Sequence, residues 1–351
     1  SLGRREWRAV TQKKSRPDDY EPPYPAFTSQ YPPDQAFMTL VQVGVQHAEG
    51  ADAARELSAV IASMEGGENA PQHYERAHEI DARGRENHIV LAYWRSPEAL
   101  AAWEARPDVR AWRETTLAGD VGIWVEAFSA PIEHLDPNYS LENIRWGSGR
   151  HVKQKWERYH SYYGSMRDRI PHGHSKTLDP PAARIARVAP PDSLGKRLRI
   201  RPPDRVCFIR GAFGWEEARP EEQQGFMDDM YPVYRNGAMF LRDNPIETNC
   251  ISLRFAEEIQ VGESNGVQSE SLGWFLSLKD LENWVHHHPT HAAIFRGVFE
   301  YMHRYNFDVR LNLGHEVIVV PEGRGVMDYN NCHPDTGFLP FFEAERLDTA
   351  D

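Results

Sequence analysis

The sequence has few cysteines and no long apolar run, and both absences exclude classes of protein. Its three cysteines, Cys207, Cys250 and Cys332, are too few and too far apart for a disulfide framework or a cysteine-rich zinc site. No apolar run approaches the roughly 18 residues of a membrane span, and no apolar core follows the charged N-terminus. We therefore expect a cytoplasmic protein that neither crosses a membrane nor carries an export signal.

An excess of positive charge is also lacking. The 40 Lys and Arg residues against 52 Asp and Glu residues give a formal net charge of −12, which repels phosphate backbones and anionic membrane surfaces. We therefore expect neither nucleic acid nor a membrane as a partner. The remaining composition, 351 residues of which 40% are hydrophobic, is that of a globular protein with a sizeable core.

Two stretches of the chain predict the same order of elements, βαββαβ. In residues 37–135 we expect strands at 38–46, 74–80, 88–94 and 122–130, with helices at 51–64 and after Ser96. In residues 204–321 we expect strands at 205–210, 249–255, 271–276 and 310–320, with helices at 221–242 and 279–304. The trio Ser96, Leu100 and Trp103 recurs with the same spacing as Ser277, Leu281 and Trp284. This pattern predicts an α+β fold in which duplicated ferredoxin-like units form a barrel.

Three segments lie outside these units. Residues 1–36 are rich in proline from Pro17 to Pro33, which precludes a helix and predicts an extended N-terminal arm. Residues 136–203 form a connecting insertion that is polar, aromatic and proline-rich, and its pattern does not identify particular helices or strands. Residues 322–351 form a C-terminal segment.

The first chemical signal is a histidine on an apolar helix face. His291 follows Pro289 and shares the spacing i, i+4, i+7 and i+11 with Phe295, Val298 and Met302. The matching position of the first unit is Val109. One unit thus has a valine where the other has an imidazole.

The second signal is a histidine on an apolar strand face. Alternation puts His315 on one face with Leu311, Leu313, Val317 and Val319. Its counterpart in the first unit is Val125. A buried imidazole costs desolvation energy unless it is hydrogen-bonded or bound to a metal. A single histidine of this kind is more often satisfied by a backbone carbonyl, but two in matching units favour a site.

Haem is a better fit to these two histidines than zinc. A neutral imidazole in an apolar pocket suits an axial haem ligand, and a second imidazole can transfer a proton near neutral pH. A zinc site at His287 and His291 is the weaker alternative, because Pro289 separates them and no H-E-x-x-H motif is present. Cys332 stands beside His333, which leaves a thiolate ligand as a further alternative, although no C-x-x-C-H motif is present.

Several segments resemble the haem-containing aldoxime dehydratases, that is the alkylaldoxime and phenylacetaldoxime dehydratases. They run in order over nearly the whole chain: PDDYEPPYP at 17–25, GSMRDR at 164–169, HPTH at 288–291, GHEV at 314–317 and NCHPDTG at 331–337. The resemblance implies a b-type haem, ferrous in the active state, and a lyase that converts R-CH=N-OH into a nitrile and water. It also implies a homodimer, and binding of the substrate nitrogen to the iron.

The resemblance also implies roles for four residues. His291, the second histidine of HPTH, is expected to be the proximal haem ligand, and His315 the distal acid–base group. Arg169 is expected to contact the oxime hydroxyl. The position of a family carboxylate falls on Asp136.

The sequence departs from the family at one position. The family has Ser or Thr after the Ile-Arg that ends the opening strand of this unit, and here Gly211 follows Ile209-Arg210. Losing one hydrogen-bond donor at a developing charge can cost on the order of 10²-fold in rate. Another donor or a water could replace the hydroxyl, or the protein could carry out different haem-dependent N–O or N–N chemistry. A non-catalytic haem carrier or gas sensor is the alternative from another class.

Overall fold

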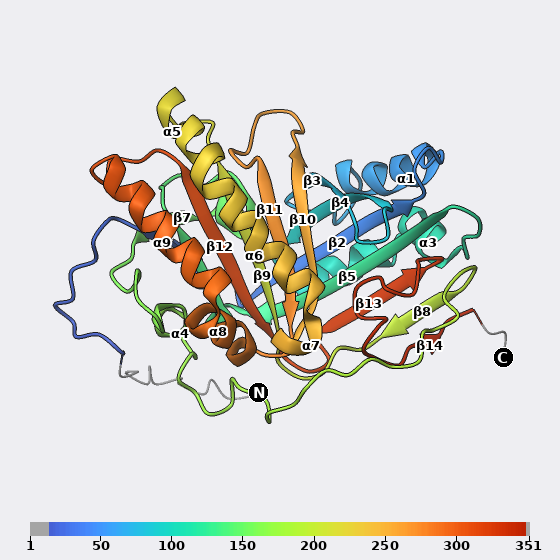
Figure 1. Ribbon diagram of the computed structural model, residues 1–351. Helices are drawn as coiled ribbons and strands as arrows, with labels where there is room; N and C mark the ends of the chain where they lie inside the picture. Colours follow the sequence, from blue (N-terminus) through green and yellow to red (C-terminus); the bar gives the residue numbers. More distant parts are fainter. Residues whose placement is uncertain (1–13, 349–351) are drawn as a thin grey trace.

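The computed structural model describes residues 14–348, in which the strands form one 14-stranded sheet (Figure 1). The strands are β1 (Phe27–Gln30), β2 (Phe37–His47), β3 (His73–Ile80), β4 (Glu86–Trp94), β5 (Val121–Pro131), β6 (Leu135–Tyr139), β7 (Lys153–Trp156), β8 (Arg197–Ile200), β9 (Val206–Gly214), β10 (Cys250–Ile259), β11 (Ser269–Phe275), β12 (Asn312–Val320), β13 (Gly325–Asn330) and β14 (Glu345–Arg346). Their order is β14-β8-β13-β5-β2-β4-β3-β10-β11-β9-β12-β6-β1-β7, and every pair is antiparallel. The prediction of an α+β fold is confirmed in this coarse form.

The first predicted unit forms the sheet segment β5-β2-β4-β3 with three helices. These helices are α1 (Ala54–Glu65), α2 (Pro97–Glu104) and α3 (Pro107–Glu114). Ser96 starts α2, because its side chain accepts a hydrogen bond from the backbone N–H of Ala99. The single helix predicted after Ser96 is two helices. Its break lies at Pro107, because the residue before a proline favours an extended backbone.

The second predicted unit forms the segment β12-β9-β11-β10, which has the same relative order as the first. Its helices are α5 (Pro220–Gly225), α6 (Tyr231–Asp243), α7 (Pro245–Thr248), α8 (Leu278–His287) and α9 (Pro289–Arg304). Two predictions of long helices need correction here. The helix expected at 221–242 contains a π-helical turn, Phe226–Met230, and the helix expected at 279–304 breaks at His288, where Pro289 forces an extended residue.

The two sheet segments face each other across one shared core, with helices on the outer side of each. Phe128 of β5 contacts both Phe208 of β9 and Trp274 of β11 within this core. Helices α1 to α3 cover the outer face of β2, β4 and β5, and α6 and α8 pack on the outer face of β9 to β12 (Figure 1). The hydrogen-bonded order of the described strands ends at β14 and β7, so they do not close into a ring.

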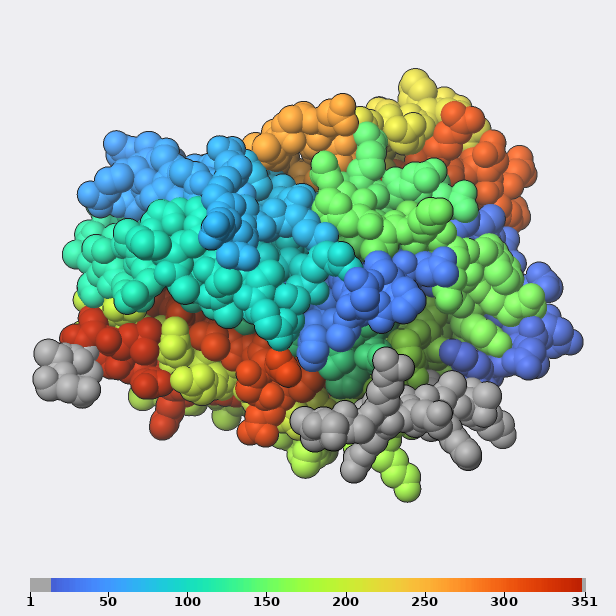
Figure 2. Space-filling view, turned by 180° about the vertical axis from the view of Figure 1, so that it is seen from behind, coloured from blue at the N-terminus to red at the C-terminus, as the bar shows by residue number. Residues whose placement is uncertain are grey.

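The segments outside the two units extend the sheet at both ends. The arm contributes β1, which pairs with β6 and β7 of the insertion, whereas β8 of the insertion pairs with β13. Figure 2 shows the blue residues of the described part of the arm lying against the green insertion. Here the Tyr20 hydroxyl donates to the His160 carbonyl at 3.0 Å. Residues 1–13 of the predicted arm lie outside the described residues. None of the described helices has both the length and the apolar composition of a membrane span.

Candidate active site

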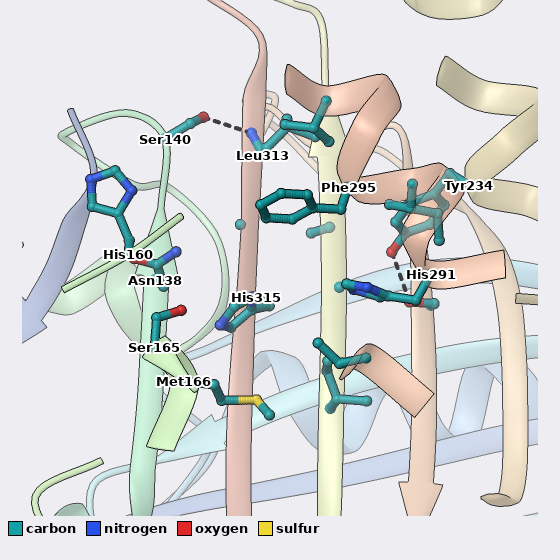
Figure 3. A pocket seen from close by; sticks show the side chains of 18 of the residues that line it. Asn138, Ser140, His160, Ser165, Met166, Tyr234, His291, Phe295, Leu313 and His315 are labelled. Atoms are coloured by element: carbon teal, nitrogen blue, oxygen red, sulfur yellow. Dashed lines mark hydrogen bonds between the residues drawn. The ribbon is translucent and has the colours of Figure 1, made fainter. Parts of the chain in front are cut away.

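A cavity of about 320 Å³ lies between the sheet and the helices of the second half. Strands β9, β11 and β12 form one wall, and helices α6, α8 and α9 form the other (Figure 3). At the matching place of the first half, Val109 of α3 and Val125 of β5 are buried in one apolar cluster between its sheet and helices. The predicted stripe of His291, Phe295, Val298 and Met302 lines this cavity, so the sequence-based face of that helix is confirmed.

His291 enters the cavity from the first turn of α9. The preceding His288 caps this helix by accepting a hydrogen bond from Thr290 N–H, 3.2 Å from its Nδ1. The Trp284 ring packs edge-on against His291 with 4.8 Å between ring centroids. The Nδ1 atom of His291 is buried and makes no hydrogen bond of normal geometry. The first turn of α9 thus fixes the position of the imidazole but leaves its Nδ1 without a hydrogen bond of normal geometry.

Burial sets the charge of His291. Desolvation lowers the pKa of His291 to about 4, and the nearby Val285 carbonyl offsets only part of this effect. The imidazole is therefore neutral at neutral pH and keeps a lone pair for a metal.

His315 contacts a buried ion pair that joins three elements. Its Nε2 lies 2.9 Å from Oδ2 of Asp136 on β6 and 3.3 Å from Nη2 of Arg169. Arg169, the last residue of α4 (Ser165–Arg169), binds both carboxylate oxygens of Asp136 at 2.7 Å. The Asp136 side chain is 0% exposed and that of Arg169 is 4% exposed. The structure therefore brings the three predicted catalytic residues together.

The ion pair fixes the charges beside His315. Burial on its own would raise the pKa of Asp136, but the Arg169 guanidinium and the His315 imidazole hold it below its ordinary value. Burial opposes the charge of Arg169, and Asp136 outweighs this and raises the pKa of Arg169. The Asp136 carboxylate can only accept, so Nε2 of His315 donates to it, and Nη2 of Arg169 at 3.3 Å is in contact with Nε2 without a hydrogen bond. Nδ1 is therefore the atom left for a substrate.

Gly211 lies directly beside His315. It is opposite His315 in the β9–β12 pairing and opposite Ser271 in the β9–β11 pairing. A Cβ at position 211 would lie 2.4 Å from the Tyr234 hydroxyl and 2.9 Å from Oγ of Ser271. These two hydroxyls are 2.8 Å apart (Figure 3). Burial raises the pKa of Tyr234 to about 12, so its hydroxyl stays protonated and can donate.

Sequence reasoning missed Tyr234 and Ser271. Met230, Tyr234, Ala238 and Leu241 all line the cavity, and their spacing is that of one helix face. This pattern alone predicts core packing. The useful signal is that a single hydroxyl interrupts an otherwise apolar face.

The two alternative ligand sets are not brought together. His287 ends α8 whereas His291 belongs to α9, so the expected break at Pro289 separates them. Cys332 is buried in the core shared by the two sheets, away from the residues that line the cavity. Burial raises the pKa of the Cys332 thiol to about 12, which removes it as a thiolate ligand near neutral pH.

The cavity residues fit a haem. The lining surface is mainly apolar, and its polar side chains include His291, His315 and Arg169. Because the Nδ1 of this neutral imidazole is buried beside the Val285 carbonyl, Nε2 is the nitrogen available to a haem iron. The wall formed by the sheet presents the His315 imidazole to the same space.

Comparisons with known proteins agree with this assignment. Residues 41–338 match the family model of the haem-containing dehydratases. The phenylacetaldoxime dehydratase of Bacillus sp. (strain OxB-1) is 34% identical over 95% of this chain and 96% of its own length. The aliphatic aldoxime dehydratase of Rhodococcus globerulus is 30% identical over 92% of each chain.

Two solved structures share the fold. The crystal structure of an aldoxime dehydratase has a TM-score of 0.83 and 28% identity, over 94% of this chain and 95% of that one. The structure of an aldoxime dehydratase in complex with butyraldoxime has a TM-score of 0.83 and 27% identity, over 94% and 93%. Because the family model spans most of the sequence and these relatives match it along nearly their whole length, the chain belongs to the haem-containing dehydratase family.

Proposed function

We propose that this protein is a lyase that dehydrates aldoximes to nitriles with a haem b held by His291. The observation that carries this proposal is one apolar cavity that receives a neutral imidazole from α9 and the His315–Asp136–Arg169 cluster from the opposite wall. The relatives named phenylacetaldoxime and aliphatic aldoxime dehydratases supply the substrate class. A non-covalent haem fits a sequence without a C-x-x-C-H motif.

The cofactor contributes one part of the chemistry. When bound in its ferrous state, the haem supplies a coordination site for the oxime nitrogen and electron density that weakens the N–O bond. His291 would hold it through Nε2, because Nδ1 is buried beside the Val285 carbonyl.

His315 moves the protons in this proposal. Hydroxide is a poor leaving group, so cleavage of the N–O bond needs a proton donor. The Nδ1–H of protonated His315 gives a proton to the oxime oxygen, the N–O bond breaks and water leaves. The now neutral Nδ1 then accepts the C–H proton, which yields the nitrile and restores the imidazolium. Atoms and charge therefore balance within the cycle.

Asp136 and Arg169 position His315. The Asp136 carboxylate stabilises the imidazolium through Nε2 at 2.9 Å. Arg169 has five N–H donors, and Asp136 and the Tyr159 carbonyl use three of them. The remaining donors support its proposed contact with the oxime hydroxyl.

Tyr234 and Ser271 take the place of the hydroxyl that Gly211 lacks. The hydroxyl pair adjoins Gly211, on the opposite side of β9 from His315. We infer that one of the two hydroxyls donates to the oxime oxygen. This compensation favours retained aldoxime dehydration over altered N–O or N–N chemistry.

Finer features of the chain also remain proposals. The matching orders β5-β2-β4-β3 and β12-β9-β11-β10 support duplicated ferredoxin-like units at 37–135 and 204–321. Three free, buried cysteines fit the expected cytoplasmic location. The homodimer is tested by sedimentation equilibrium of the haem-loaded protein.

The test of function is a spectrum and a product assay. The dithionite-reduced protein is mixed with phenylacetaldoxime or butyraldoxime, the haem band is followed, and nitrile is measured by chromatography. A band shift with nitrile formation supports the proposal. A haem band without nitrile from either substrate indicates altered chemistry or a haem carrier, and failure to bind haem rejects the proposal.

A further inference from the structure

A second cluster of possible ligands lies on the first half, outside the haem cavity. His47 ends β2, and Glu86 begins β4 directly opposite it in the ladder. His88 is two residues further along β4 and therefore points to the same face as Glu86. One ligand atom of each of these three residues lies within 4.8 Å of the others. None of the three lines the haem cavity.

The hydrogen bonding of His47 leaves one ring nitrogen ready to bind a metal. Its Nδ1 is 2.8 Å from the Ala48 carbonyl. A carbonyl can only accept, so Nδ1 carries the proton and Nε2 keeps the lone pair. Metal-binding histidines usually donate their other N–H to such a carbonyl, which fixes both tautomer and ring orientation.

His88 and His78 complete the cluster. The rings of His88 and His47 stack with 5.3 Å between centroids, and Nδ1 of His88 is buried without a hydrogen-bond partner. His78 of β3 is opposite His88 in the ladder, and its Nε2 is 3.2 Å from Oε2 of Glu86. Three neighbouring strands thus supply three imidazoles and one carboxylate at one place.

We propose that His47, His78, Glu86 and His88 form a binding site for a divalent transition metal, best fitted to Zn²⁺. Imidazole and carboxylate are ligands that zinc takes in tetrahedral sites, at bond lengths of roughly 2.0–2.2 Å. The donor atoms of His47, Glu86 and His88 lie within 4.8 Å of one another, so binding an ion requires these side chains to rotate toward a common centre. The bound ion would link β2, β3 and β4.

The experiment measures zinc on the untagged, haem-loaded protein. The protein is titrated with zinc chloride by calorimetry, and after dialysis its zinc and iron are counted separately by plasma mass spectrometry. His88→Ala and Glu86→Gln are compared with the wild type. The control is His151→Ala, because His151 belongs to another histidine pair, 2.8 Å from Nδ1 of His73.

We expect one zinc per chain in the wild type and in His151→Ala. Both cluster variants should bind at least roughly tenfold more weakly, since losing even an outer partner of a ligand costs that much. Unchanged iron content and haem spectrum show that each variant is folded. The proposal would be overturned if the wild type bound no zinc, or if His88→Ala and Glu86→Gln bound zinc with the affinity of the wild type.

Discussion

Asp136 and His315 are hydrogen-bonded at 2.9 Å although 179 residues separate them along the chain. The pairing of β6 with β12 creates this contact, because Asp136 lies opposite Val317 and Asn138 lies opposite His315. The proposed acid–base group is therefore complete only when the insertion has added β6 to the sheet of the second half. The role of His315 in proton transfer and the contribution of the Asp136–Arg169 pair to stability can therefore be tested separately.

Replacing His315 by Ala removes the proposed proton donor. We expect kcat to fall about 10²- to 10⁴-fold, the usual contribution of general acid–base catalysis. Haem content and the band shift on aldoxime binding should stay, because His291 is untouched. His303→Ala, at an exposed position of α9, is the matched control and should keep its rate. A His315→Ala variant with the wild-type rate would rule out the role.

Replacing Asp136 by Asn leaves Arg169 buried without its carboxylate. Breaking a buried ion pair on one side costs about 3–5 kcal/mol, and this loss should appear in urea unfolding. The double variant Asp136→Leu/Arg169→Met should recover part of it, because no unpaired charge remains. Glu114→Gln, in an exposed pair with Arg110, should change little. Equal stability of Asp136→Asn and the wild type would contradict the proposed coupling.

Periodic segments were predictable from the sequence, and so were the two histidines that break their pattern. His291 and His315 each replace a valine of the first half, and both line the cavity. Asp136 and Arg169 were predicted only from the family resemblance. Their elements β6 and α4 have five residues each, too few to show a hydrophobic periodicity.

The remaining features depend on long-range contacts. Strand β1, with four residues after a proline-rich stretch, is stabilised by pairing with β6 and β7. Tyr234 has the spacing of an ordinary core residue, and only its position 2.4 Å from a Cβ at Gly211 supports its proposed role in place of the missing hydroxyl. Local patterns cannot contain this information.

Acid should destabilise the haem-free protein through His291. The pKa of His291 is lowered to about 4 by burial, from an ordinary 6.5. Between these values the unfolded chain binds a proton that the folded imidazole does not, so the free energy of unfolding falls as the pH drops from about 6.5 to 4. The loss reaches about 3 kcal/mol.

The comparison is between the wild type and His291→Phe, by urea unfolding at pH 7 and pH 4.5. His151 and His160, whose pKa values burial also lowers to about 4, are present in both proteins and cancel. The variant should lose less stability than the wild type over this interval. An equal loss in both would show that His291 is not buried in its neutral form.

Substitutions at Gly211 and Tyr234 test whether the tyrosine hydroxyl replaces the one missing at position 211. Tyr234→Phe should lower kcat on the order of 10²-fold without loss of haem, because it removes a donor near the developing charge. Gly211→Ser on its own should not raise activity, since its Cβ would lie 2.4 Å from the Tyr234 hydroxyl.

In the double variant Gly211→Ser/Tyr234→Phe that hydroxyl is gone, and the nearest ring atom, Cζ, is 3.7 Å away. Once the Ser271 hydroxyl, 2.9 Å from the new Cβ, has rotated away, the serine fits and should restore much of the rate lost in Tyr234→Phe. Tyr231→Phe, whose hydroxyl binds Glu257, controls for loss of a tyrosine from the same helix. If the double variant is no faster than Tyr234→Phe, the tyrosine does not stand in for a hydroxyl at position 211.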